Sequence, residues 1–308
     1  MANDGADSLA TLSTDHPSPG ADLLAQLGLE HRLERLGHSP YHGNLSLWGS
    51  DHAHADHFLC HGRRNGWHLD RAAFDAWLRR EAVSRKAGLV SPGHIDGIVP
   101  APDGWVVQVR GMGAVAARVL VDASGRRSAL ATRLGVRRRR IDGLLAMATH
   151  TGPAPHLAGL SLVESFADGW WYAAGLPDGR TLVALMTDAD VAKAHDYPDA
   201  VNFLQAWRET RLLSHHVQPP DASPPIHGFA AQSGFIEHAA GDRWIAVGDA
   251  LMGFDPLTSA GICGALHDAI AAVPAITGQL DGDTAEARGY PDAAKSMLRR
   301  FLSEHESH

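Results

Sequence analysis

The sequence predicts an α/β fold with an inserted antiparallel β-sheet. Two apolar strand candidates, RVLVD at 118–122 and RWIAV at 243–247, each run into a turn of small residues and then a helical pattern. Between them, residues 144–187 change texture: LLAMATHTG, SLVESFADGWWYAAGLP and RTLVALMT read as successive strands. These observations indicate a discontinuous α/β domain, 1–143 and 230–308, that surrounds a β-rich domain, 144–229.

The composition is that of an ordinary globular protein. The chain has 308 residues, of which 44% are hydrophobic and 20% are charged, enough for one large or two modest domains. Its net charge of −8 gives no general attraction to nucleic acid or anionic membrane. Two cysteines cannot build a disulfide framework, no apolar run reaches the roughly 20 residues of a membrane span, and no signal peptide is evident. We therefore expect a cytoplasmic protein with no nucleic-acid or membrane partner.

The first half of the chain alternates helical and strand patterns. Leucines recur at helical spacing near the N-terminus, and Asp70 precedes a segment in which Phe74, Trp77 and Leu78 share one face. The elements expected are a helix over 21–37, a strand over Asn44–Trp48, a helix from Asp70 to Gly88, and strands over 104–109 and 118–122.

The second half begins with the β-rich stretch and ends in helices. Turn residues at Asp168-Gly169 and Pro177-Asp178-Gly179 divide the stretch into a meander. The helices expected are 198–213, with Phe203, Leu204 and Trp207 inward, then 261–276 and 290–303.

The segment VLVDASGRRSAL carries the first candidate ligand site. A strand ends in Asp122-Ala-Ser-Gly125, and small residues at the carboxyl end of a strand let a ligand approach the backbone closely. The same residues also suit a plain strand, a turn and a helix capped by Ser124, so both interpretations stay open.

The segment WIAVGDALMGFDPLTSAGICGALHDAI carries a stronger candidate. Gly248-Asp249 ends an apolar strand, where a carboxylate can accept a sugar hydroxyl, and Pro256 stiffens the loop that follows. Ala260 and Gly261 then open a helix whose free N–H groups favour an electron-rich ligand edge. A structural turn alone would not need all three features together.

These motifs together resemble the FAD-dependent monooxygenases and their halogenase and reductase cousins. GWHLDRAAFDAWL and GWWYAAGLPDGRTLVALMTDAD add to the likeness, which runs in order through residues 20–275. The second of these resembles the tryptophan-halogenase-like branch, which includes flavoproteins that modify tryptophan during maturation of peptide-derived quinone cofactors. The resemblance implies an FAD/NAD(P)-binding three-layer α/β fold with an inserted antiparallel β-sheet substrate domain.

The resemblance also assigns roles around a bound FAD. Asp249 would hold the ribityl hydroxyls, Pro256 would lie beside the isoalloxazine, and Arg71 would lie near the flavin or its phosphates. The full implied cofactor set is Arg71, Asp122 (near the diphosphate), Gly125, Gly248, Asp249, Pro256, and the backbone of Ala260, Gly261 and Ile262. On the substrate side, Trp170, Trp171 and Tyr172 are candidates for lining the site, or else alternate between core and surface along one strand.

The function implied is hydroxylation of an electron-rich aromatic by a flavin C4a-hydroperoxide. Electrons would come from NAD(P)H or a flavin reductase, and the preferred substrate is a tryptophan side chain of a peptide or protein. No residue is assigned as the catalytic group.

Three departures from the family pattern bear on this expectation. The strand–Gly-x-Gly-x-x-Gly–helix unit expected within the first fifty residues is not found, and the one near-match, GMGAVA at 111–116, reads as a hairpin turn. The halogenases use a lysine before the Asp-Arg helix, and here none precedes Lys86, which disfavours halogenation; Cys263 replaces a common Asn. The gene product would begin upstream of Met1, or the chain would be a truncated, non-catalytic flavoprotein remnant.

Two other motifs have alternative interpretations. The cluster His52, His54, Asp56 and His57 has the spacing of a dinuclear zinc hydrolase, with His94 and Asp249 as further ligands, or it is a solvated loop in a chain with 20 histidines. The run of four arginines at 137–140 is expected to be a solvated turn rather than a nucleic-acid patch.

Overall fold

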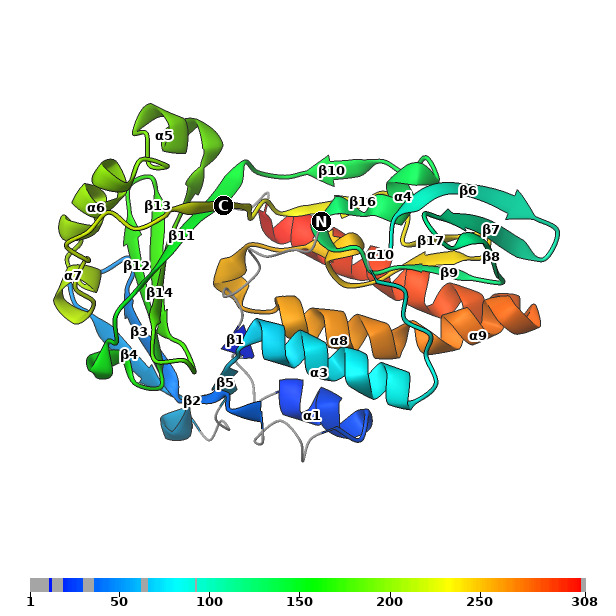
Figure 1. Cartoon of the computed structure of the whole chain (residues 1–308), viewed down its shortest axis with the longest axis horizontal. Helices are drawn as coiled ribbons and strands as arrows, with labels where there is room; N and C mark the ends of the chain where they lie inside the picture. Colours follow the sequence, from blue (N-terminus) through cyan, green and yellow to red (C-terminus); the bar gives the residue numbers. More distant parts are fainter. Residues whose placement is uncertain (1–10, 13–18, 30–35, 62–65, 92, 306–308) are drawn as a thin grey trace.

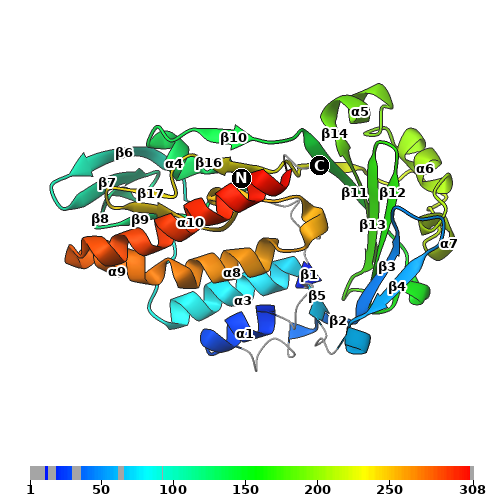
Figure 2. The same cartoon turned by 180° about the vertical axis from the view of Figure 1, so that it is seen from behind.

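The computed structural model describes residues 11–12, 19–29, 36–61, 66–91 and 93–305. It shows two lobes beside each other, one built on a large sheet and one on long helices with smaller sheets (Figure 1). The view from behind shows the same division, with the helices stacked beside the sheet lobe (Figure 2).

The sheet lobe is a seven-stranded sheet in the order β15-β11-β14-β13-β12-β3-β4. The expected meander is confirmed, because β12, β13 and β14 pair antiparallel in sequence and turn at 167–168 and 176–180. β11 then pairs along its whole length with β14. The bounds are β3 Gly43–Leu47, β4 His54–His57, β11 Leu144–Thr151, β12 Leu160–Phe166, β13 Gly169–Gly175, β14 Thr181–Asp188 and β15 His227–Ala230.

This sheet also recruits a strand pair from the N-terminal half. β3 pairs parallel with β12 and antiparallel with β4, so the sheet extends beyond the 144–229 boundaries drawn from the sequence. The cause is that Leu45 and Leu47 pack into the same apolar cluster as β12 and β13. A sequence pattern of local strands carries no information on such a distant partner.

Helices cover the outer face of this sheet (Figure 1). The predicted inward face of Phe203, Leu204 and Trp207 is confirmed, since all three are buried. The predicted single helix over 198–213 is wrong, because the buried Glu164 carboxylate accepts N–H bonds from residues 211–213 and starts a separate short helix there. The elements are α5 Ala189–Ala194, α6 Ala200–Arg208 and α7 Leu213–His216.

The second lobe contains three small sheets. β9 and β18 are the two apolar strands singled out in the sequence, and they pair parallel, with β17 on the far side of β18. GMGAVA falls on the hairpin between β7 and β8, as expected. The bounds are β6 Ile95–Ala101, β7 Gly104–Val109, β8 Gly113–Ala117, β9 Leu120–Asp122, β10 Arg138–Arg140, β16 Gly234–Ile236, β17 Ala240–Gly241, β18 Trp244–Ala246 and β19 Met252–Gly253; β1 Thr11–Leu12, β2 Ser39–Tyr41 and β5 Gly66–His68 form a further sheet below.

The helices of this lobe stack beside the small sheets (Figure 2). Asp70 caps α3 as predicted, accepting the N–H of Ala73 at 2.8 Å. The predicted helix 21–37 is shorter than expected, because the chain leaves α1 through Gly28 at a φ of +67°; residues 30–35 lie outside the described part. The bounds are α1 Pro19–Gln26, α3 Arg71–Ser84, α4 Ala129–Arg133, α8 Gly261–Ala271, α9 Val273–Asp281 and α10 Thr284–His305.

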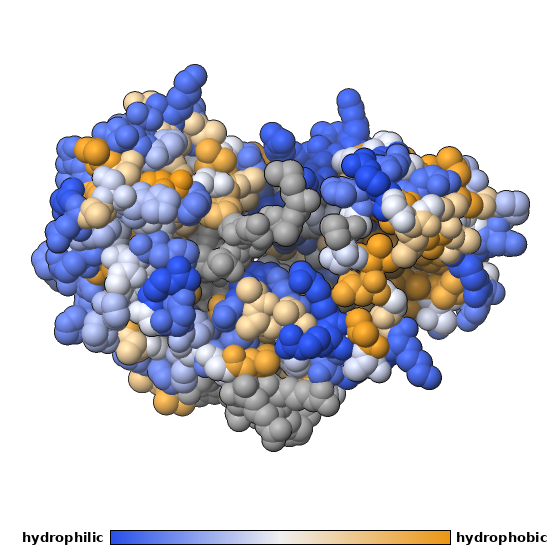
Figure 3. Space-filling model, in the orientation of Figure 1, coloured by the Kyte–Doolittle hydropathy of each residue, from blue (hydrophilic) through white to orange (hydrophobic). Residues whose placement is uncertain are grey.

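One helical segment has the length and apolar composition of a membrane span, contrary to the expectation from the sequence. It covers Gly261–Asp281, joins α8 to α9, and is 28% buried. Apolar residues gather on the side of the molecule where β9, α8 and α9 lie (Figure 3). Val121 of β9 and Val273 of α9 are 43% and 55% exposed.

Candidate functional site

A cavity of about 550 Å³ lies between the two lobes. One wall comes from α3, the turns after β9 and β18, and the start of α8. We call it the polar wall because it carries the charged residues of the lining, although apolar residues such as Phe74 and Leu266 lie among them. The other wall is apolar and comes from the inner face of the seven-stranded sheet. The polar wall includes Arg71, Gly125, Arg126, Gly248, Asp249, Pro256, Ala260, Gly261 and Ile262, and the apolar wall includes Ala146, Trp170, Tyr172, Met186 and Phe229.

The turn after β18 is fixed in place by α8. Gly248 has a φ of +57°, and a Cβ there would lie 3.2 Å from the side chain of Ala265, so both the backbone angle and the close packing require glycine. Its N–H donates to the buried carboxylate of Asp268 on α8 at 3.0 Å. The strand end, the turn and the helix are thereby held as one unit that presents Asp249 to the cavity.

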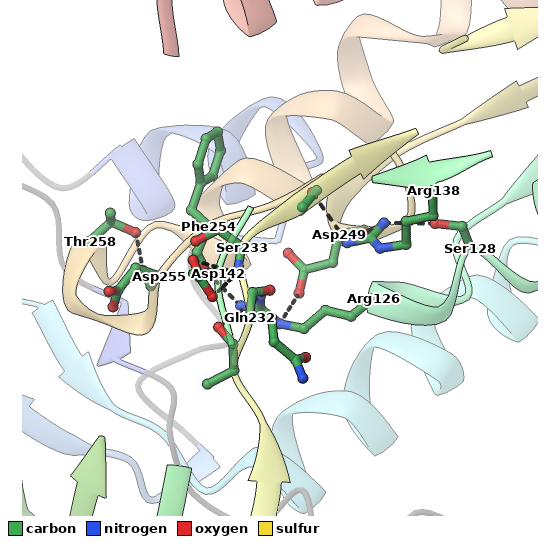
Figure 4. A network of polar contacts seen from close by, with 12 residues as sticks. Arg126, Ser128, Arg138, Asp142, Gln232, Ser233, Asp249, Phe254, Asp255 and Thr258 are labelled. Carbon is green, nitrogen blue, oxygen red and sulfur yellow. Dashed lines mark hydrogen bonds and ion pairs between the residues drawn. The ribbon is translucent and has the colours of Figure 1, made fainter. Parts of the chain in front are cut away.

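Asp249 lies between two arginines (Figure 4). Its carboxylate lies 3.4 Å from Nε of Arg126, and Arg138 donates to its backbone carbonyl at 3.1 Å and to Ser128 Oγ at 2.7 Å. Burial raises the pKa of Asp249, and the neighbouring Arg126, Arg138 and Arg71 oppose that rise. The arginines therefore help to keep this half-buried carboxylate ionised and able to accept hydroxyl hydrogens.

Arg126 is itself held rigidly. It donates to the carbonyls of Gln232 and Phe254, both at 2.6 Å (Figure 4). A Cβ on Gly253 would lie 3.0 Å from the Arg126 guanidinium, so the chain passes close beside it. These contacts join the turn after β9 to the loop after β19.

The start of α8 faces open space. Asp255 caps the Pro256 turn by accepting the N–H of Leu257 at 2.8 Å, and the chain then enters α8 at Ala260 with no side-chain cap. A Cβ added at Gly261 would meet nothing within 4 Å. The first N–H groups of this 11-residue helix are therefore free of side-chain acceptors and border the cavity.

The apolar wall follows the alternation of β13. Trp170 and Tyr172 line the cavity, as expected for the substrate side. Trp171 does not line the cavity and follows the alternative interpretation, in which successive side chains of the strand point to opposite faces. Its ring packs on the outer side of the sheet, 5.1 Å from Phe203 of α6.

Asp122 has a role in the fold itself, and its expected place near the diphosphate stays a prediction. Asp122 is 1% exposed, and it does not line the cavity. One carboxylate oxygen accepts from the backbone of Ser124, and the other accepts from the N–H groups of Leu130 and Ala131 at the start of α4. Asp122 thus fixes the turn after β9, while Gly125 in that turn borders the cavity at a φ of +69°.

Arg71, the second residue of the Asp-Arg pair, borders the cavity as expected. It contacts Asp75 one turn along α3 at 3.3 Å. Its Nε is buried and has no hydrogen-bond partner among the residues described. A donor left in this state suits an acceptor group of a bound ligand.

The structure gives no support to the zinc alternative. His54, Asp56 and His57 lie on β4, an edge strand, where His54 and His57 are exposed. His94 precedes β6 in the opposite lobe (Figure 1). Within the described ranges, no three or more His, Cys, Asp or Glu side chains are grouped to hold a metal ion.

The sequence predicted that the arginine run would be a solvated turn, and this prediction is wrong. Residues 138–140 form β10 against β16, with Arg138 bonded beneath Asp249 and Arg139 paired with Glu237 at 2.8 Å. Arg126 and Arg138 are the site residues that sequence reasoning missed. Arg126 directly follows Gly125 of the first motif, so its position in the sequence could have indicated a site residue. Arg138 could not be recognised, because it is one inward-facing residue within a run of four arginines.

Comparison with known proteins places this fold and cavity in a family of FAD-dependent oxidoreductase-type enzymes. The chain belongs to the tryptophan halogenase family, whose model matches residues 52–303. It is 33% identical over 252 residues to LodB of Marinomonas mediterranea, described as an FAD-dependent oxidoreductase, covering 78% of this chain and 67% of that protein. It is 21% identical to the flavin-dependent halogenase armH5 of Armillaria mellea, covering 98% of this chain and 66% of that protein.

Solved structures confirm the fold class. The flavin-dependent halogenase CmlS superposes with a TM-score of 0.80 at 22% identity, covering 94% of this chain and 55% of that one. The peptidyl tryptophan dihydroxylase QhpG superposes with a TM-score of 0.72 at 25% identity, covering 93% of this chain and 63% of that one. The chain therefore spans about half to two thirds of the length of these relatives.

These relatives confirm FAD as the cofactor, and the cavity fits its flavin end. The open side of Gly261, the uncapped start of α8 and the unpartnered Arg71 Nε are three features that a bound ligand would complete. The Gly-rich sequence nearest to a diphosphate loop lies on the β7–β8 hairpin instead. The direct contact of each residue with FAD stays a prediction.

Proposed function

We propose that this chain oxygenates an aromatic ring with FAD, and that the ring is a tryptophan side chain of a peptide or protein. The observation that carries the proposal is the contrast between the two walls of the cavity. A polar wall with a carboxylate and a helix N-terminus and an apolar wall with Trp170 and Tyr172 line the same cavity. A flavin edge suits the first wall, and a planar aromatic suits the second.

FAD, when bound, supplies the activation of dioxygen. The residues of this chain would hold the cofactor and orient the substrate. Asp249 would accept hydrogen bonds from the ribityl hydroxyls, and the free N–H groups at the start of α8 would stabilise negative charge on the flavin edge. The apolar wall excludes water and places the ring opposite the flavin. Electrons come from NAD(P)H or from a separate flavin reductase.

One relative supports the aromatic substrate, and another supports the flavin chemistry. QhpG is named a peptidyl tryptophan dihydroxylase, and LodB is named an FAD-dependent oxidoreductase. The relatives also include flavin-dependent halogenases, for which the same cavity would hold a flavin and a substrate. No lysine is among the described residues that line the cavity, which favours oxygen over halogen insertion.

The test is a titration followed by product analysis. The full chain is titrated with FAD, and the change in flavin absorbance is recorded for the wild type and for Asp249→Ala. A peptide with one central tryptophan is then added together with NADH, a flavin reductase, bromide and oxygen. The mass of the product is measured by mass spectrometry.

Addition of oxygen to the peptide supports the proposal, and addition of bromine makes the chain a halogenase. Absence of FAD binding, or a titration identical for wild type and Asp249→Ala, contradicts the proposed flavin site.

A further inference from the structure

Three polar side chains, of which two are buried and one is half-buried, connect this cavity with a second one. Tyr172 lies on the apolar wall, and its hydroxyl is 3.1 Å from Ser161 Oγ on β12. Ser161 Oγ is in turn 3.1 Å from Nε2 of His68 on β5. His68 borders a second cavity of about 390 Å³, together with His42, Gly175 and Arg180.

The middle of this line is closed to water. Ser161 is 2% exposed and His68 is 3% exposed. Burying a hydroxyl and an imidazole costs free energy unless they are hydrogen-bonded, and apolar residues would fill the same volume at less cost. The three side chains come from β5, β12 and β13, so local sequence does not force them together. Their contact calls for an explanation beyond packing.

The far end of the line borders the second cavity. Nδ1 of His68 is buried and has no hydrogen-bond partner among the residues that the structure describes. Burial lowers the pKa of His68 to about 4, the Gly175 carbonyl opposes this, and His42 adds to it. The ring of Tyr41 packs on another side at 4.8 Å, and Arg180 lies across the second cavity. The imidazole is therefore neutral at pH 7, with one nitrogen ready to accept a proton.

Both hydroxyls of the line can donate and accept. The hydrogens can run from Tyr172 to Ser161 to His68, or in the reverse order, without moving a heavy atom. Two such arrangements of the same groups are what a chain needs to pass a proton from one end to the other.

We propose that Tyr172, Ser161 and His68 form a proton path from the aromatic-binding cavity to the second cavity. This inference rests on the proposed function, because substitution on an aromatic ring releases the proton of the carbon that is attacked. That proton goes to the Tyr172 oxygen, and the C–H electron pair returns to the ring. The Tyr172 hydrogen moves to Ser161, the Ser161 hydrogen moves to Nε2 of His68, and His68 releases a proton from Nδ1 to water. No electron is transferred along the path.

The first test asks whether the line is continuous in the purified full chain. The side-chain nitrogen-15 NMR signals of His68 are assigned by their loss in His68→Gln. We expect Ser161→Ala to shift them, and Tyr172→Phe to shift them as well, although Tyr172 is two bonds along the line. Ser165→Ala, on the same strand but bonded to the Leu47 carbonyl, serves as the control and leaves them unchanged. If the His68 nitrogen signals do not shift in Tyr172→Phe, the proposed proton path is wrong.

The second test asks whether the path carries the reaction's proton. With the tryptophan peptide and FAD, we expect Ser161→Ala to lower turnover by about tenfold or more at unchanged KM, and to alter the solvent deuterium isotope effect. Ser161→Thr keeps the hydroxyl and restores part of the rate, and Ser165→Ala retains it. Equal turnover of Ser161→Ala and Ser165→Ala overturns the path. If the wild type binds FAD but leaves the peptide unchanged, the proposed function is contradicted instead. The path would then have no proton from this reaction to carry.

Discussion

The two walls of the cavity differ in how they are built. The polar wall comes from short continuous segments, in which Gly248, Asp249 and Pro256 follow one another along the chain. The apolar wall takes single residues from β11, β13, β14 and β15, and only the order of strands in the sheet brings them together. A cofactor end can therefore be inferred from a motif, whereas a substrate surface depends on the pairing of strands.

The largest effect expected is on the face of the sheet that does not border the cavity. Trp171→Ala empties a site packed against Phe203 of α6, and should lower the free energy of unfolding by about 3–5 kcal/mol. Because Trp171 points away from the cavity, FAD affinity of the folded protein should not change. Denaturant unfolding and flavin titration measure the two quantities. Trp48→Ala, at a 46% exposed tryptophan, is the control, and a loss of FAD affinity without a loss of stability would show that Trp171 faces the site after all.

A second effect concerns the buried imidazole behind the apolar wall. His68 in the folded chain has its pKa lowered to about 4 from 6.5 by burial, so the unfolded chain binds a proton in the window between these values and the folded chain does not. Stability due to this group is therefore complete above pH 6.5 and falls as the pH drops toward 4, by about 3 kcal/mol in total. His68→Gln should flatten that slope, as measured by denaturant unfolding between pH 7 and pH 4.

The matched change is His54→Gln, at an exposed histidine of the edge strand β4. If both variants keep the wild-type slope, the loss of stability in acid arises elsewhere in the chain.

The third effect tests the polar wall. Asp249→Ala removes the carboxylate that pairs with Arg126, and should weaken FAD binding by about 1–3 kcal/mol, or roughly five- to 150-fold. Flavin absorbance titration measures the change. Asp242→Ala, in the exposed turn before β18, should bind FAD as the wild type does. Equal affinity of both variants would mean that the motif residue does not hold the cofactor.

The smallest effect is at the helix entrance. Gly261→Ala adds a methyl group where nothing lies within 4 Å, so the folded chain should be unchanged or more stable by up to about 1 kcal/mol. FAD should bind several-fold more weakly, because the methyl occupies ligand space. Thermal unfolding without FAD and flavin titration separate the two. Gly264→Ala, one turn further along α8 with equally open surroundings and outside the cavity lining, is the control.

The sequence supported the expected α/β character, the meander, the Asp70 cap and most of the polar wall. These features depend on contacts between near neighbours in the chain, such as the N–H of Ala73 on Asp70. What it missed depends on distant contacts. Nothing near Asn44 indicates pairing with Ser161, and nothing near Arg138 indicates a bond to the carbonyl of Asp249.

Asp122 and Trp171 illustrate two limits of a sequence motif. A carboxylate at a strand end can hold either a ligand or its own turn, and the four residues between Gly125 and Leu130 decide in favour of the turn. An aromatic run on a strand necessarily splits between two faces, and only the register of β13 against β14 decides which face borders the cavity.

The parallel pairing of β3 with β12 has a consequence for the order of assembly. β12, β13 and β14 follow one another in the sequence and can pair locally. β3 and β12 are separated by a long stretch of chain, so their pairing closes a large loop. Closing so large a loop has a high entropy cost, which makes such pairings late steps in folding. The Ser161 strand and the His68 strand meet only after that closure, so the line between the two cavities is among the last features to form. Limited proteolysis during refolding should find the segment around β3 cleavable longest.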